Sequence, residues 1–216
     1  MARVNIVGFD QRLIACTGAG EMVIAYGCGS GDLLKQLRDK FVIRIGLGVS
    51  EQRLNEAAGN GTEGCELRKA DLNEAFPLPS DCADAMIANQ VIEHVIDPGH
   101  FASELYRILR RGGRYFVATP NIRYIKSILK LLTSGYGPRT SGGNTRDGAW
   151  DDGHLHYFTH RDLRELFIQT GFREVRSSAL INLDDGGIIR RIMNHECSSW
   201  LIRELFSGNI LLYGTK

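Results

Sequence analysis

The chain has 216 residues, of which 43% are hydrophobic and 24% are charged, and its formal net charge is +1. This length suits one α/β domain with a large core, and the near-neutral charge gives no overall field that would draw the molecule to nucleic acid or to an anionic membrane. The five cysteines are scattered without a C-x-x-C pair, and no apolar run reaches membrane-spanning length, so we expect a cytoplasmic protein with no disulfide framework and no signal peptide.

Short apolar runs alternate with helical patterns along the first half of the chain. Strands are expected at residues 22–26, 41–49, 65–70, 83–89 and 114–119, and helices at 32–39, 51–59 and 100–111. Bounded apolar runs of this length are typical of buried strands. Ser50 precedes the second helix and is expected to cap it. The alternation predicts a parallel sheet covered by helices on both faces.

This rhythm breaks in the second half of the chain. A helix over 122–132 is followed by a stretch rich in Gly, Ser, Asp and Asn at 133–152, and loops of this length are typical of functional lids or disordered segments. A helix at 160–172 with a glycine C-cap follows, then strands at 173–181 and 209–214, with one or two helices between 186 and 207. We interpret residues 1–216 as a single domain with a lid or substrate-binding insertion at about 122–160.

A glycine-rich turn, "GCGSG" at residues 27–31, separates the first strand from the first helix. Glycines at such a turn let the backbone approach a ligand closely, and the helix N-terminus offers free N–H groups. The dinucleotide pattern G-x-G-x-x-G fails at Asp32, and the absence of G-K-[ST] excludes a P-loop. A cofactor without a phosphate at this point fits better, and the alternative is a tight turn needed only for packing.

Further motifs follow this turn in order: "LRKADLNEAF", "FPLPSDCAD", "VIEHVIDP" and "LRRGGRYFVATPN". Together with "VIAYGCGSGDLL" they resemble the signature blocks of class I S-adenosylmethionine (SAM) methyltransferases. "HLHYFTHRDLRELFIQTGF" is similar to the late helix of the small-molecule type 11/12 branch. The resemblance covers about residues 20–175 and implies a Rossmann-like, seven-stranded, mostly parallel sheet with one antiparallel strand and helices on both faces.

The resemblance also implies the cofactor, SAM, and the residues that would hold it. Asp71 would accept a hydrogen bond from the adenine amino group, unless it caps a following helix instead. Residues at the ends of the first and fourth strands would lie near the methionine part and the transferred methyl, because open α/β sheets bind ligands at the carboxyl ends of their strands. The cofactor-binding residues expected in this way are Gly27, Cys28, Gly29, Gly48, Val49, Asp71, Leu72, Asn89 and Gln90.

Two positions depart from the family pattern. Ala25 stands where the family usually has an acidic residue two positions before the first glycine. Gly48 stands where the family usually has the Asp or Glu that holds both ribose hydroxyls, and the nearest acid is Glu51. A charged hydrogen bond contributes about 1.5–3 kcal/mol, so its loss corresponds to roughly 10- to 100-fold weaker cofactor binding.

Histidines supply the candidate general bases. His94 follows the fourth strand, and His154 and His156 follow the expected lid, where a histidine that titrates near neutrality suits proton abstraction. The alternative is that these side chains make only local structural contacts. His154, His156 and His160 are also spaced as H-x-H-x3-H, but methyl transfer needs no metal and we expect none.

Four arginines surround the expected junction of the third helix with the fifth strand. Helical spacing would place Arg107, Arg110 and Arg111 near one another, beside Arg114. We interpret this cluster as a solvated face, since RNA binding would need more basic surface and aromatic platforms. Neither nucleic acid nor a membrane is therefore an expected partner.

These observations favour a SAM-dependent methyltransferase that acts on an oxygen, nitrogen or carbon of a small metabolite. The alternative is a non-catalytic protein of the same fold, with weak or no SAM binding, that serves as a partner or regulatory subunit. An NAD-dependent oxidoreductase is disfavoured, because both the sixth-position glycine and a ribose-binding acid are missing. A homodimer or another protein partner is left open.

Overall fold

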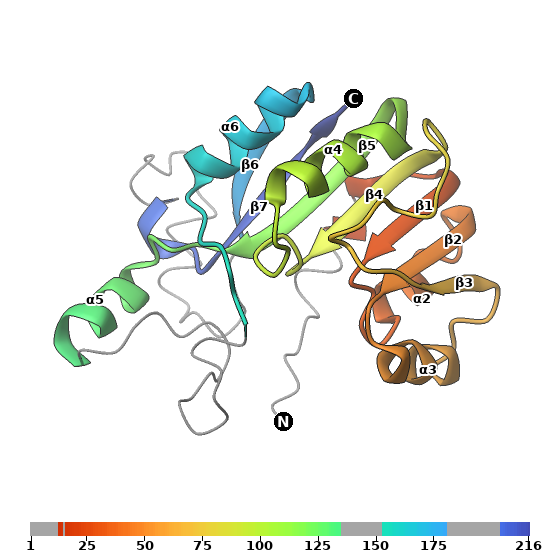
Figure 1. Cartoon of the computed structure of the whole chain (residues 1–216), viewed down its shortest axis with the longest axis horizontal. Helices are drawn as coiled ribbons and strands as arrows, with labels where there is room; N and C mark the ends of the chain where they lie inside the picture. Colours follow the sequence, from red (N-terminus) through yellow and green to blue (C-terminus); the bar gives the residue numbers. More distant parts are fainter. Residues whose placement is uncertain (1–12, 15, 135–152, 181–203) are drawn as a thin grey trace.

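A computed structural model describes residues 13–14, 16–134, 153–180 and 204–216 (Figure 1). Seven strands form one sheet in the order β3-β2-β1-β4-β5-β7-β6. All pairs from β3 through β5 are parallel, and β7 runs antiparallel to both β5 and β6. The strands are β1 (Gly20–Tyr26), β2 (Phe41–Gly48), β3 (Cys65–Lys69), β4 (Ala83–Asn89), β5 (Leu109–Pro120), β6 (Arg173–Leu180) and β7 (Asn209–Thr215). The predicted seven-stranded, mostly parallel sheet is therefore confirmed.

Side chains alternate between the two faces of this sheet, and both faces are covered. In β1, Ile24 and Tyr26 belong to the larger apolar cluster, whereas Val23 belongs to a second cluster. The larger cluster includes Phe101 from α4 (Pro98–Ile108) and Phe167 from α6 (His160–Thr170), and both helices lie on the same side of the sheet (Figure 1). The second cluster is covered in part by α2 (Asp32–Gln36). Burial on both faces explains why the strands appear as continuous apolar runs.

Two predicted helix caps, the N-cap at Ser50 and the C-cap at Gly171, are confirmed. Ser50 Oγ accepts a hydrogen bond of 3.3 Å from Arg53 N at the start of α3 (Glu51–Gly59). Thr159 and Asp162 form a capping box at the start of α6, and Gly171 ends that helix in the left-handed conformation. These caps satisfy backbone groups that have no partner within the helix.

The junction between α4 and β5 differs from the prediction. The helix ends at Ile108 and the strand begins at Leu109, so Arg110 and Arg111 lie on the strand. The early start of β5 is accompanied by a register shift in its pairing with β4. Ala83 pairs with Leu109, whereas Ala85 pairs with Arg114. The predicted helical cluster of arginines is therefore wrong.

The remaining predicted elements lie near or beyond the described residues. The helix expected at 122–132 is α5 (Ile125–Ser134), which extends away from the sheet in Figure 1. The loop expected at 133–152 and the helices expected at 186–207 fall almost entirely outside the described ranges. Within those ranges, every helix is too short or too polar to cross a membrane.

Candidate functional site

The parallel strands β1, β2 and β4 end side by side, and the glycine turn leaves the sheet at this edge. Gly27 and Gly29 have φ values of +61° and +54°, a region that side chains other than glycine rarely adopt. A Cβ on Gly27 would also meet Val91 Cγ2 at 2.6 Å, whereas a Cβ on Gly29 would find nothing nearer than Gly27 O at 3.9 Å. The turn therefore requires glycine at both positions and leaves space above the backbone of Gly29.

The end of β2 holds no acidic side chain. Gly48 is half-buried and Val49 is 66% exposed. Ala25, the second departure from the family pattern, is buried in β1 between Gly46 of β2 and Ile87 of β4. Neither of the two positions therefore places an acidic side chain at this edge of the sheet.

Asp71 lies just beyond β3, on the exposed surface. Its Oδ1 accepts hydrogen bonds from Asn73 N at 2.9 Å and from Asn73 Nδ2 at 2.8 Å. A turn follows instead of a helix, so the alternative that Asp71 caps a helix is wrong. Leu72, beside it, is half-buried against the larger apolar cluster. Because both of these hydrogen bonds go to Oδ1, Oδ2 can accept one from a ligand.

β4 ends at Asn89, and Gln90 follows it at the same edge of the sheet. Gln90 is exposed and has a φ of +56°, which is uncommon for a residue with a side chain. Its backbone N donates to Ala118 O at 2.9 Å, and its Nε2 lies 3.4 Å from Asn209 Oδ1. Neighbouring strands thus hold this residue in a conformation that is costly for an L-amino acid, as often occurs at functional sites.

A buried acid, Glu93, lies three residues beyond Gln90, in the turn that leads to α4. It is 0% exposed, and its carbonyl oxygen accepts from Leu155 N at 2.8 Å and from His156 N at 3.1 Å. Its Oε2 accepts from Thr119 Oγ1 at 3.0 Å. These contacts join the ends of β4 and β5 to the segment that carries His154.

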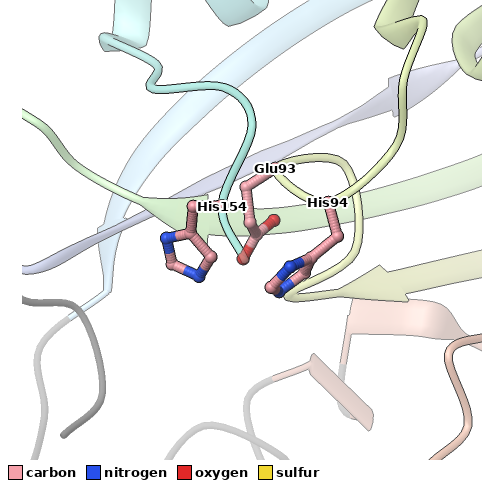
Figure 2. Close-up of side chains that lie close together, drawn as sticks. All are labelled: Glu93, His94 and His154. Atoms are coloured by element: carbon pink, nitrogen blue, oxygen red, sulfur yellow. The ribbon is translucent and has the colours of Figure 1, made fainter. Parts of the chain in front are cut away.

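Two of the three histidines predicted as candidate bases meet beside Glu93 (Figure 2). The rings of His94 and His154 have centroids 4.6 Å apart at an interplanar angle of 73°. His94 Nδ1 lies 3.2 Å from Gly153 O. His156 points elsewhere, with Nε2 at 3.2 Å from Ile96 O. The structure therefore brings His94 and His154 together and separates His156 from them.

His160, the last member of the predicted histidine run, is the first residue of α6 and is only 1% exposed. Among the described residues, Glu93, His94 and His154 form a group whose potential ligand atoms all lie within 4.8 Å of one another. Glu93 is not among the site residues predicted from the sequence. The available signal was an acid inside the apolar run "VIEHV", directly after a buried strand.

Burial changes the protonation of Glu93. Removal from water raises the pKa of its carboxyl group to about 7, while backbone hydrogen bonding and the bond from Thr119 oppose this effect. A carboxyl group with a pKa near neutrality is common at functional sites. The edge formed by β1, β2 and β4 thus combines an open glycine turn with a group of proton-binding or metal-binding side chains.

The sheet order, the antiparallel last strand and the glycine turn after β1 together define a class I SAM-dependent methyltransferase fold. The family model described as "MetW: Methionine biosynthesis protein MetW" matches residues 10–210. The chain belongs to this MetW family.

Individual relatives agree with this class. A Mycolicibacterium smegmatis protein named a probable SAM-dependent methyltransferase is 37% identical over 111 residues, which are 51% of this chain and 42% of the relative. The ubiquinone biosynthesis O-methyltransferase of Caulobacter vibrioides is 30% identical over 112 residues, which are 50% of this chain and 44% of the relative. The chain thus spans less than half the length of these curated relatives.

A solved structure extends the likeness to nearly the whole chain. It is described as a complex between the Haloferax volcanii Trm112 methyltransferase activator and the putative methyltransferase. The TM-score is 0.68 at 21% identity, covering 95% of this chain and 86% of that one. At this identity the likeness shows the shared fold.

Proposed function

We propose that this protein is a SAM-dependent methyltransferase that acts on an oxygen, nitrogen or carbon of a small metabolite. The observation that carries the proposal is the arrangement at one sheet edge. In the strand order, the glycine turn after β1 lies between the end of β3, which the exposed Asp71 follows, and the end of β4, which leads to the histidine pair. A ligand that spans this edge would place a nucleoside toward Asp71 and its reactive end toward the histidines.

The residues at this edge fit SAM. Gly27, Cys28 and Gly29 would hold its methionine part, since the space above Gly29 is open. Asp71 Oδ2 would accept from the adenine amino group, with Leu72 beside the ring. The further contacts would come from the ends of the neighbouring strands, namely Gly48, Val49, Asn89 and Gln90.

SAM supplies its own electrophilic methyl group, so the protein must mainly orient the acceptor and remove a proton where the acceptor requires it. His94 and His154 face one another beside this edge, and we favour them as the base over His156, which is turned toward Ile96. Residues 122–160 would shape the acceptor pocket as an insertion in a single domain.

One observation favours a second function. Ala25 and Gly48 stand at the two positions where this family usually has acidic residues near SAM. Without these acids, the protein would bind SAM weakly or not at all. It would then serve as a non-catalytic partner or regulatory subunit. A partner role is compatible with the structural neighbour from Haloferax volcanii, which was solved in complex with an activator protein.

Calorimetric titration with SAM separates the two functions. We expect micromolar binding, and no binding up to about millimolar SAM would contradict the methyltransferase proposal. Asp71→Ala removes the proposed adenine contact, and we expect roughly 10- to 100-fold weaker binding, because a hydrogen bond to a charged group contributes about 1.5–3 kcal/mol.

Two controls accompany this measurement. Glu74→Ala removes an exposed acid from the same turn and should leave SAM affinity unchanged. Asp71→Asn keeps an acceptor for Asn73 but replaces the Oδ2 acceptor by an NH2 donor, so it should preserve the turn and still weaken binding about as much as Asp71→Ala does. Equal affinity in the wild type and Asp71→Ala would contradict the adenine assignment.

A further inference from the structure

We propose that Glu93, His94 and His154 bind one divalent transition-metal ion of the zinc type. No metal is predicted from the sequence, and the run formed by His154, His156 and His160 shares only His154 with this group. The other two ligands come from the turn after β4, about 60 residues earlier in the chain.

The geometry of the group matches a mononuclear site. Figure 2 shows the three side chains converging, two from the turn after β4 and one from the segment that follows residue 152. Their potential ligand atoms lie within 4.8 Å of one another. Ligands at about 2.0–2.2 Å from a tetrahedral ion lie roughly 3–3.5 Å apart. Atoms at the upper end of the observed range would therefore have to approach one another by roughly 1–2 Å when an ion binds.

The donor atoms select the kind of ion. Two imidazole nitrogens and one carboxylate oxygen suit zinc, cobalt or nickel, whereas magnesium and calcium prefer oxygen ligands alone. Three protein ligands leave at least one coordination position for water or for a substrate atom. Such an open position is typical of catalytic metal sites.

The surroundings already orient two of the ligands. Thr119 Oγ1 donates to Glu93 Oε2, while Glu93 Oε1 is buried without a hydrogen-bond partner among the described residues. A buried carboxylate oxygen of this kind costs free energy that a bound cation would offset. His94 Nδ1 lies 3.2 Å from Gly153 O. If Nδ1 donates a hydrogen bond to this carbonyl, the lone pair of Nε2 is left for the metal. Backbone carbonyls commonly orient metal-binding histidines in this way.

The role of the ion rests on the proposed methyltransferase function. A cation at this edge would bind an acceptor oxygen and lower its pKa, which removes the need for a free imidazole base. The lone pairs of His94 and His154 would then be occupied by the metal. Metal binding itself does not depend on SAM and can be measured without it.

The test uses the full chain after removal of metal with a chelator. Co²⁺ is added without SAM, and its visible absorption bands report direct coordination. Zn²⁺ should then displace it at a 1:1 ratio. We expect Glu93→Gln and His154→Ala each to weaken Co²⁺ binding about 10- to 100-fold. Glu93→Gln keeps an acceptor for Thr119 and so preserves the local packing.

The matched control is His156→Ala, which removes a histidine two positions from His154 and should leave Co²⁺ affinity unchanged. Circular dichroism checks that each variant is folded. An absent cobalt spectrum, thiolate-type bands, or equal affinity in all variants would overturn the proposal. If Co²⁺ binds but SAM does not, the metal site stands and the methyltransferase proposal fails. If SAM binds but Co²⁺ does not, the methyltransferase proposal stands and the metal site fails.

Discussion

At the end of β2, a side chain at position 48 would enter available space. A Cβ built on Gly48 would meet Leu54 Cδ2 at 3.4 Å, an ordinary contact distance. The residue lies outside the left-handed region, so its backbone tolerates other amino acids. The absence of an acid here is therefore not imposed by packing.

Restoring this acid is a test at the scale of one residue. We expect Gly48→Asp to strengthen SAM binding by about 10- to 100-fold, because a carboxylate that accepts from the ribose hydroxyls contributes about 1.5–3 kcal/mol. Calorimetric titration checks the change. Gly48→Asn has nearly the same shape without the charge, and an equal gain with Asn would show that the charge is irrelevant.

Asp71 and Glu93 differ in how well the sequence alone predicts a site residue. Asp71 was found from its motif, and the structure places it on the surface, beyond its strand, with one carboxylate oxygen engaged in its own turn. The apolar run around Glu93 was a local signal of burial, but it does not indicate which groups surround the carboxylate. Its environment comes from Thr119 on a neighbouring strand and from residues 155 and 156.

At the scale of elements, α4 holds the loop that leads into β4. Arg107 donates to Leu78 O at 2.8 Å and to Phe76 O at 3.1 Å, and it pairs with Glu104 at 2.7 Å. Glu104 is only 8% exposed and also accepts from Phe76 N at 2.8 Å. This pair therefore connects the helix to the loop. Arg107 thus departs from the predicted solvated arginine face, whereas Arg110, Arg111 and Arg114 are exposed as predicted.

The Glu104–Arg107 pair predicts a pH-dependent contribution to stability. The hydrogen bond from Arg107 lowers the pKa of Glu104 below its ordinary value of 4.5. Because the folded-state pKa is the lower one, this stabilisation is complete above about pH 4.5 and is lost as the pH falls through the folded-state value. We expect Glu104→Gln to lower the free energy of unfolding by about 1–3 kcal/mol near neutrality.

Urea unfolding at neutral and acidic pH measures this contribution. The difference between wild type and Glu104→Gln should shrink toward about pH 3. Glu165→Gln is the control, since it breaks a Glu–Arg pair with Arg161 whose side chains are 51% and 83% exposed. Exposed pairs contribute little, so this variant should change stability by less than about 1 kcal/mol. A constant difference across the pH range would contradict the assignment to Glu104.

At the scale of the whole molecule, SAM would bind an edge where several strands end. A ligand that binds only the folded state stabilises it, by about 2.7 kcal/mol at 100 times its dissociation constant. For a chain of 216 residues this corresponds to a rise in melting temperature of roughly 5–10 °C. Differential scanning calorimetry with and without SAM measures it. Methionine, which lacks the nucleoside, should give a much smaller rise, and no rise with SAM would favour the non-catalytic alternative.

Much of the architecture could be predicted because its signals are local. The apolar runs at residues 22–26 and 83–89 are continuous, since both faces of their strands are buried. The prediction failed at Arg110 and Arg111, where the helical pattern continued past Ile108. The pairing of β5 with β4 overrides that pattern, and only the neighbouring strand could reveal it.

The sequence by itself determined the strand and helix rhythm, the glycine turn and the order of motifs, because each of these depends on residues close together in the chain. The tertiary structure alone decided that Glu93 and His94 meet His154, and that His156 and His160 do not join them. The physical reason is that this meeting depends on hydrogen bonds across about 60 positions, from Leu155 and His156 to the carbonyl of Glu93. No spacing along the chain encodes such a contact, which forms only when the ends of β4 and β5 lie side by side.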